Sequence, residues 1–123
     1  MSPRSEEFVE VARRKLLLAR ASLEAGFSED AAAAAYYAML SAARAALSEQ
    51  DVHAKTHNGV WTLFSDRFVR TGAVGRELGG YADAAREQRQ QADYETGGAS
   101  PEEALVAIGH AQEFVERIEV LLR

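Results

Sequence analysis

Arg89 is the residue whose position most clearly suggests chemistry. It lies on the apolar face that a helical spacing predicts for the segment from Val74 to about Tyr94, where every other member is apolar: Leu78, Ala82, Ala85 and Ala92. A buried charge without a partner is very costly. Arg89 therefore either pairs with Asp93 one turn later, or binds a phosphate or carboxylate, or lies at a subunit interface.

Three further cations could contribute to an anion site. Arg44 lies among alanines on the shoulder of an apolar helix face, where it either extends its stem over apolar surface or binds phosphate. Lys55 and His57 precede or open a short expected helix, whose N-terminal amides favour phosphate; a solvated loop is the alternative. His53 and His57 have a metal-ligand spacing, but Asp51 is the one acid close to them in sequence, so no metal and no cofactor are expected.

Composition excludes several other classes of chemistry. The chain has 123 residues and no cysteine, so it has no disulfide, thiolate metal site or cysteine nucleophile. It also lacks the sequence motifs of serine hydrolases, phosphate-loop enzymes, zinc proteases and dinucleotide-binding domains. The net charge of −5 requires any RNA site to be a local cluster of cations.

Length and hydropathy indicate a single domain, residues 1–123, in the cytoplasm. The first residues lack the apolar segment of a signal peptide. The longest apolar run, Ala31 to Leu40, is half of the ~20 residues that span a bilayer, so no membrane association is expected.

The chain is rich in alanine, which favours helix, and no segment alternates like a strand. Ser2 or Ser5, Ser28, Thr56 and Ser100 are the expected N-caps, and Gly26 and Thr71-Gly72 the expected stops. Ser100-Pro101-Glu102-Glu103 is the strongest start signal, and it opens a final helix with Leu105, Ile108, Ala111, Val115, Ile118 and Leu122 on its apolar face. The sequence thus predicts an all-α fold, a single up-down bundle of four long helices plus one shorter helix.

Three strings together resemble small stand-alone proteins of the HEPN family. They are AYYAMLSAARAAL from Ala35 to Leu47, KTHNGV from Lys55 to Val60, and RQQADY from Arg89 to Tyr94. The resemblance covers residues from about 8 to 122. It implies a bundle of four or five helices, a homodimer, and a toxin encoded beside a minimal nucleotidyltransferase as antitoxin.

The resemblance also implies a metal-independent ribonuclease in which Arg89 holds the scissile phosphate. In the family a histidine five to seven residues further on helps to move the proton of the ribose 2′-hydroxyl. Here Tyr94 stands five residues after Arg89, and Asp93, Tyr94 and His57 are the candidates for that proton transfer. Arg44 and Lys55 are further candidates for binding RNA. Because a partner transferase adenylylates a tyrosine just after the motif in some pairs, the resemblance makes Tyr94 a candidate for this modification. The alternative is a non-catalytic HEPN dimer that binds a nucleotidyltransferase, a nucleotide or RNA.

Overall fold

The structure is a computed structural model of the whole chain. It describes the backbone of residues 1–94 and 98–123, and the side chains of residues 1–90 and 98–123. All regular structure in these residues is helical, which confirms the predicted fold class. The helices are α1 (Pro3–Glu24), α2 (Ser28–Glu49), α3 (His57–Phe64), the π-helical turn η1 (Ser65–Val69), α4 (Arg76–Tyr94) and α5 (Pro101–Leu122).

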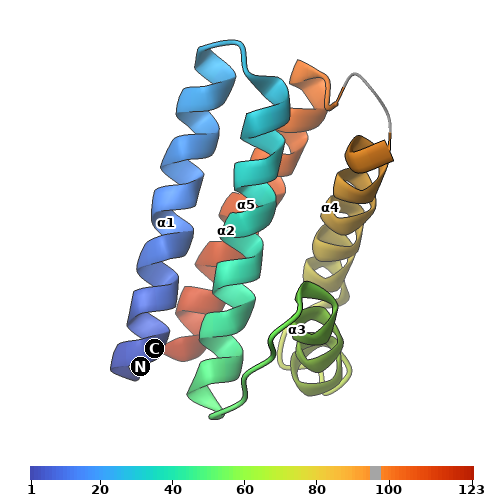
Figure 1. Cartoon of the computed structure of the whole chain (residues 1–123). Helices are drawn as coiled ribbons and strands as arrows, with labels where there is room; N and C mark the ends of the chain where they lie inside the picture. The colour runs from blue at the N-terminus through green and yellow to red at the C-terminus, as the bar shows by residue number, and fades with distance from the viewer. Residues whose placement is uncertain (95–97) are drawn as a thin grey trace.

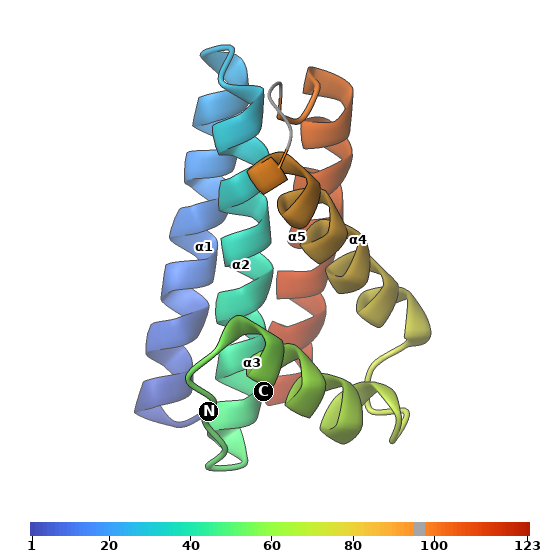
Figure 2. The ribbon, with the colours of Figure 1, turned by 45° about the vertical axis from the view of Figure 1, so that its right-hand side comes forward.

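The long helices α1, α2, α4 and α5 run alternately up and down, and α3 with η1 crosses beside the lower part of α2 (Figure 1). Figure 2 shows that α4 is tilted across the other long helices rather than aligned with them. The first and last residues lie close together at one end of the bundle.

α2 is the central helix of the bundle. It packs most extensively against α1 and α5, and α3 and α4 pack on it as well. Its buried residues occur all round the helix and are mainly alanines, among them Ala35, Ala38, Ala42 and Ala46. Small side chains let neighbouring helices approach closely, and larger residues from the other helices fill the space between them, including Leu16, Phe64, Phe114 and Ile118.

Most of the predicted caps are confirmed. The Ser2 hydroxyl accepts a hydrogen bond from the Ser5 amide at the start of α1, and Thr56 does the same for Gly59 at the start of α3. Ser100 and Glu103 form a reciprocal capping box at the start of α5. Gly26 has a φ of 88° directly after α1, as expected for a helix stop.

The prediction that Ser28 caps α2 is wrong. The amide of Phe27 donates to Ser22 and that of Gly26 to Leu23, which is the Schellman arrangement at the end of α1. The Phe27 carbonyl then accepts from Ala31, so Phe27 is already the N-cap of α2 and Ser28 is its first helical residue. The connection between the two helices is one residue shorter than the serine pattern suggests.

Leu105 was expected on the buried face of α5 but is 62% exposed. The buried face instead comprises Ala104, Ala107, Ile108, Ala111, Phe114, Val115, Ile118 and Leu122. Phe114 packs against Trp61 and Phe64 of α3, and this aromatic contact fixes the rotation of α5. Ala104 therefore occupies the buried position that hydropathy predicted for Leu105.

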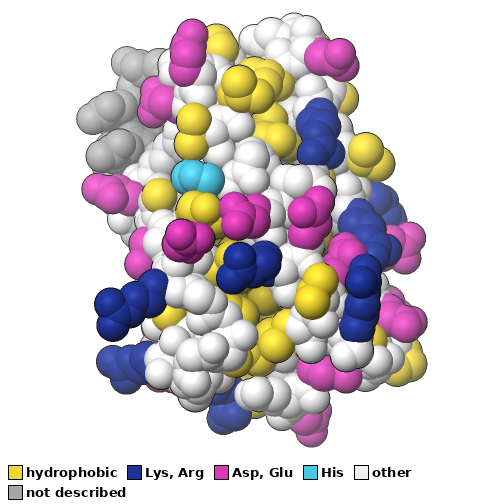
Figure 3. All heavy atoms as spheres, turned by 180° about the vertical axis from the view of Figure 1, so that it is seen from behind, with side chains coloured by type: hydrophobic (Ala, Val, Ile, Leu, Met, Phe, Trp, Pro, Cys, Tyr) yellow, Lys and Arg dark blue, Asp and Glu magenta, His cyan; other side chains and the backbone are white. Residues whose placement is uncertain are grey.

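The face of the molecule on which α5 lies carries acidic and basic side chains interspersed with apolar ones (Figure 3). Leu105, Val106 and Val120 of α5 and Leu17 and Leu18 of α1 are among the exposed apolar residues. Within the described residues no helix is long and apolar enough to cross a bilayer.

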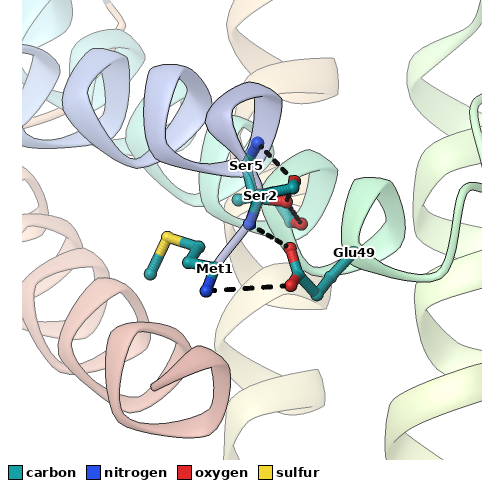
Figure 4. A network of polar contacts seen from close by, with 5 residues as sticks. Met1, Ser2, Ser5 and Glu49 are labelled. Carbon is teal, nitrogen blue, oxygen red and sulfur yellow. Dashed lines mark hydrogen bonds and ion pairs between the residues drawn. The ribbon is translucent and has the colours of Figure 1, made fainter.

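A polar network fastens the start of α1 to the end of α2 (Figure 4). The Glu49 carboxylate accepts from the Ser2 amide at 3.0 Å and lies 4.0 Å from the Met1 amino group. The buried Ser5 hydroxyl donates to the Ala45 carbonyl at 3.0 Å. These contacts hold the pKa of Glu49 below its usual value, chiefly through the hydrogen bond from the Ser2 backbone.

Candidate functional site

His57 is the first residue of α3, and the local sequence fixes its position. Thr56 caps the helix through the Gly59 amide at 2.9 Å. A Cβ on Gly59 would lie 2.9 Å from the Thr56 hydroxyl oxygen and 3.2 Å from Ala54 Cβ, so glycine leaves room for this cap. The next turn buries Val60, Trp61 and Phe64, which anchor the helix beneath the imidazole.

Two arginines one turn apart on α4 meet the first turn of α3. Arg89 Nη1 lies 3.2 Å from His57 Nδ1, and Arg86 Nη2 donates to Asn58 Oδ1 at 2.9 Å. The apolar residues on the same face of α4, Leu78, Ala82 and Ala85, are buried as predicted. Arg89 itself is half-buried, and its charged end reaches α3 rather than the core.

Two tyrosines of α2 also surround Arg89. The guanidinium carbon lies 5.1 Å from the ring centre of Tyr36 and 4.8 Å from that of Tyr37. Both distances are within the range of cation–π attraction, which is strongest where the cation is desolvated. The aromatic rings therefore hold Arg89 in place without neutralising its charge.

A chain of hydrogen bonds orients the imidazole. The buried Trp61 Nε1–H donates to the Tyr36 hydroxyl oxygen at 3.1 Å, which leaves the Tyr36 proton to point at His57 Nδ1, 3.4 Å away. Arg89 is a donor only, so Nδ1 must accept from it as well. The arrangement favours the tautomer of neutral His57 that carries its proton on Nε2.

The electrostatics keep this histidine neutral. Partial burial lowers the pKa of His57 from its usual value of 6.5, and the positive charges of Arg89 and Arg44 lower it further. At neutral pH the ring is therefore unprotonated and Nδ1 has a lone pair. A neutral imidazole beside a fixed cation is the pair of groups needed to accept a proton next to a bound phosphate.

The other sequence candidates are placed as follows. Arg44 lines a small cavity of about 90 Å³ with Arg4 and His53. Its buried Nε has no hydrogen-bond partner among the described residues. Lys55 is exposed in the connection before α3, and His53 lies 3.6 Å from Asp51.

Asp93 and Tyr94 end α4, but their side chains lie outside the described residues. The described side chains contain no group of three or more histidines and acids that could hold a metal ion. Among the candidates for proton transfer whose side chains the structure describes, His57 contacts Arg89.

Tyr36, Tyr37, Trp61 and Asn58 contribute to the site although sequence reasoning assigned them no role. The two tyrosines and Asn58 are part of the strings that carry the family resemblance, which is the signal that could have found them. The indole donor of Trp61 is recognised only from its partner, since a tryptophan in a buried helix face is normally a packing residue.

A cavity of about 210 Å³ opens beside Arg89, between α2 and α4. Tyr36, Tyr37 and Gln88 line it together with Glu29, and Ala99 borders it from the segment before α5. Arg89 belongs to its wall, so a group bound in the cavity lies next to the anion site.

The family model of the HEPN domain matches residues 5–121, and the chain therefore belongs to the HEPN family. It is 33% identical over 118 residues to the Methanocaldococcus jannaschii protein named "Putative toxin MJ0605", covering 96% of this chain and 88% of that protein. A second M. jannaschii protein, "Putative toxin MJ0142", is 30% identical over 73% of this chain and 61% of its own length. A UPF0332 protein of Gloeobacter violaceus is 28% identical, with 94% of each chain covered.

Proposed function

We propose that this protein is a toxin of the HEPN family that cleaves RNA without a metal ion, with Arg89 and His57 as its catalytic residues. The observation that carries the proposal is the 3.2 Å contact between Arg89 and a histidine that is kept neutral. The names of the two M. jannaschii relatives, each a candidate toxin, support the biological role.

The geometry suggests the order in which Arg89 and His57 act. Without RNA, Arg89 donates to His57 Nδ1 and occupies its lone pair. A phosphodiester binds the guanidinium more strongly than a neutral imidazole does, because the hydrogen bonds are then charge-assisted at both ends. Arg89 therefore turns to the phosphate, and once the 2′-hydroxyl also displaces the long 3.4 Å contact from Tyr36, Nδ1 becomes available to the neighbouring ribose.

In the reaction His57 Nδ1 accepts the proton of the 2′-hydroxyl as the 2′-oxygen attacks phosphorus. The bond from phosphorus to the 5′-oxygen breaks, and the leaving oxygen takes a proton from solvent. The products are a 2′,3′-cyclic phosphate and a 5′-hydroxyl end. Arg89 stabilises the charge that develops on the phosphoryl oxygens.

Purified protein and a mixed-sequence RNA, with chelator present, test this proposal. Arg89→Gln and His57→Asn should each lower the cleavage rate by about 100-fold or more, the effect typical of losing a general base or an anion-stabilising group. His110→Asn is the control, because that ring stacks on Tyr81 at 4.0 Å and does not contact Arg89. Intact RNA with the unaltered protein, or cleavage that requires added divalent ions, would overturn it. Intact RNA would favour the non-catalytic module.

The proposal extends to the partner and the place of action. We expect a minimal nucleotidyltransferase encoded next to this chain, and RNA in the cytoplasm as the target. Co-expression with that transferase should add the mass of an adenylyl group to the protein, and Tyr94→Phe should abolish the addition. An unchanged mass, or a modification that survives Tyr94→Phe, would contradict the assignment of Tyr94 as the acceptor.

A further inference from the structure

We propose that the cavity between α2 and α4 binds a guanine base of the RNA, the one attached to the ribose whose 3′-phosphate lies at Arg89. The inference rests on the proposed function and adds the sequence preference of the same site. Arg89 belongs both to the anion site and to the wall of the cavity. One nucleotide can thus place its phosphate on the guanidinium and its base in the cavity.

The size and lining of the cavity suit a base. Its volume of about 210 Å³ is below the ~300–1,000 Å³ of sites for drug-sized ligands, so it fits a single heterocycle rather than a larger molecule. Tyr37 is half-buried and lines the wall, where its ring offers a stacking surface. Stacking on aromatic side chains and on arginine planes is how proteins hold unpaired RNA bases.

Glu29 gives the cavity its selectivity. Glu29 lines the cavity from the first turn of α2, its side chain is exposed, and its carboxylate has two acceptor oxygens. The Watson–Crick edge of guanine has two adjacent donors, the N1–H and the 2-amino group, which match the two oxygens. Adenine, cytosine and uracil each present at least one acceptor at the corresponding edge, and a carboxylate repels it.

The Glu29 side chain packs against the backbone of Gly98. Gly98 has a φ of 56°, and a Cβ on it would lie 2.6 Å from Glu29 Cδ. The segment before α5 therefore passes directly against the Glu29 side chain. Gln88 of α4 also lines the cavity, and its Nε2 donates to the Glu103 carboxylate at 3.4 Å.

The experiment measures binding of the four nucleoside 3′-monophosphates, with inorganic phosphate as a reference, by isothermal titration calorimetry. We expect guanosine 3′-monophosphate to bind roughly 5- to 150-fold more tightly than the other three, the discrimination typical of a bidentate base contact. Glu29→Gln should abolish this preference, and inorganic phosphate should bind no more weakly than it does to the unaltered protein. Asp30→Asn is the matched control, since it removes the same charge from the same turn of α2 and does not line the cavity.

The outcomes separate this inference from the proposed function. Guanosine preference that is lost in Glu29→Gln supports the base site even if RNA is not cleaved. Equal affinities for the four nucleotides would overturn the base site and leave the role of Arg89 intact. A guanosine preference that Glu29→Gln does not change would have the same consequence. Absence of nucleotide binding at millimolar concentration also overturns it. With an active enzyme, cleavage should fall on the 3′ side of guanosine.

Discussion

The contact between Arg89 and His57 links the protonation of a histidine to the presence of a single guanidinium. Two causes lower the pKa of His57, partial burial first and the positive charges of Arg89 and Arg44 second. They respond differently to substitution, because removing a charge leaves burial almost unchanged. The two causes can therefore be measured separately.

A titration of the His57 ring by NMR should give a pKa below 6.5, and Arg89→Gln should raise it part of the way back. Arg86→Gln, which removes the neighbouring arginine that binds Asn58, should leave it close to the original value. A His57 pKa that is the same in the unaltered protein and in Arg89→Gln would contradict the contact.

The same shift makes folding depend on pH. Between the lowered pKa and 6.5 the unfolded chain binds a proton at His57 that the folded protein does not bind. The free energy of unfolding should therefore decrease as the pH falls through this window. Above pH 6.5 the stability linked to neutral His57 is fully present. Urea unfolding of the protein and of His57→Asn at several pH values should show a smaller pH dependence in the variant.

At the scale of helices, two serines that the sequence places at the start of a helix differ in their contacts. Ser100 caps α5 in a reciprocal capping box, whereas Ser28 is the first helical residue of α2, whose N-cap Phe27 makes no side-chain cap. Ser100→Ala should therefore lower the free energy of unfolding by about 1 kcal/mol. Ser28→Ala should change it by less than about 0.5 kcal/mol. Equal effects in urea denaturation would contradict the assignment of the caps.

Helix ends were predictable to the extent that a cap depends on residues within one turn. Thr56 and Ser100 satisfy that condition, and both predictions are confirmed. Ser28 does not, because the Schellman turn at the end of α1 decides where α2 begins. The rotation of α5 was not predictable either, since a contact of Phe114 with another helix outweighs the hydropathy of Leu105.

The site was predictable only in part for the same reason. The position of Arg89 on an apolar face identified it without knowledge of the fold. Its contact with His57 joins residues 32 positions apart, and no local pattern encodes such a pair. The two tyrosines that hold the guanidinium come from a third helix, so apart from the family resemblance only the packing reveals their role.

For the whole molecule we expect a homodimer in which the Arg89 residues of both copies face a shared cleft. A half-buried arginine on a helix face of small residues is more readily covered at a two-fold interface than in the core of its own chain. Light scattering at micromolar concentration should give twice the 13.4 kDa of one chain. A monomer under these conditions would contradict the expectation.

The absence of cysteine makes the orientation of such a dimer testable. Gln90 is exposed beside Arg89, so Gln90→Cys places one thiol on the expected shared face. Oxidation should then trap a covalent dimer, whereas Leu17→Cys on α1 should remain uncoupled at the same protein concentration. Trapping through residue 17 instead would assign the interface to the exposed apolar residues of α1.

The tilt of α4 across the bundle has a consequence for local stability. Its buried face consists, among the described side chains, of Leu78 and two alanines, whereas α5 buries Phe114, Val115 and two isoleucines. Because α4 buries so little apolar surface, it should detach locally while α1, α2 and α5 stay folded. Amide hydrogen exchange should therefore show lower protection in α4 than in α2 and α5, and bound nucleotide should raise the protection of α4 most. α4, the helix that carries Arg89, would then open to admit RNA and close when RNA is bound.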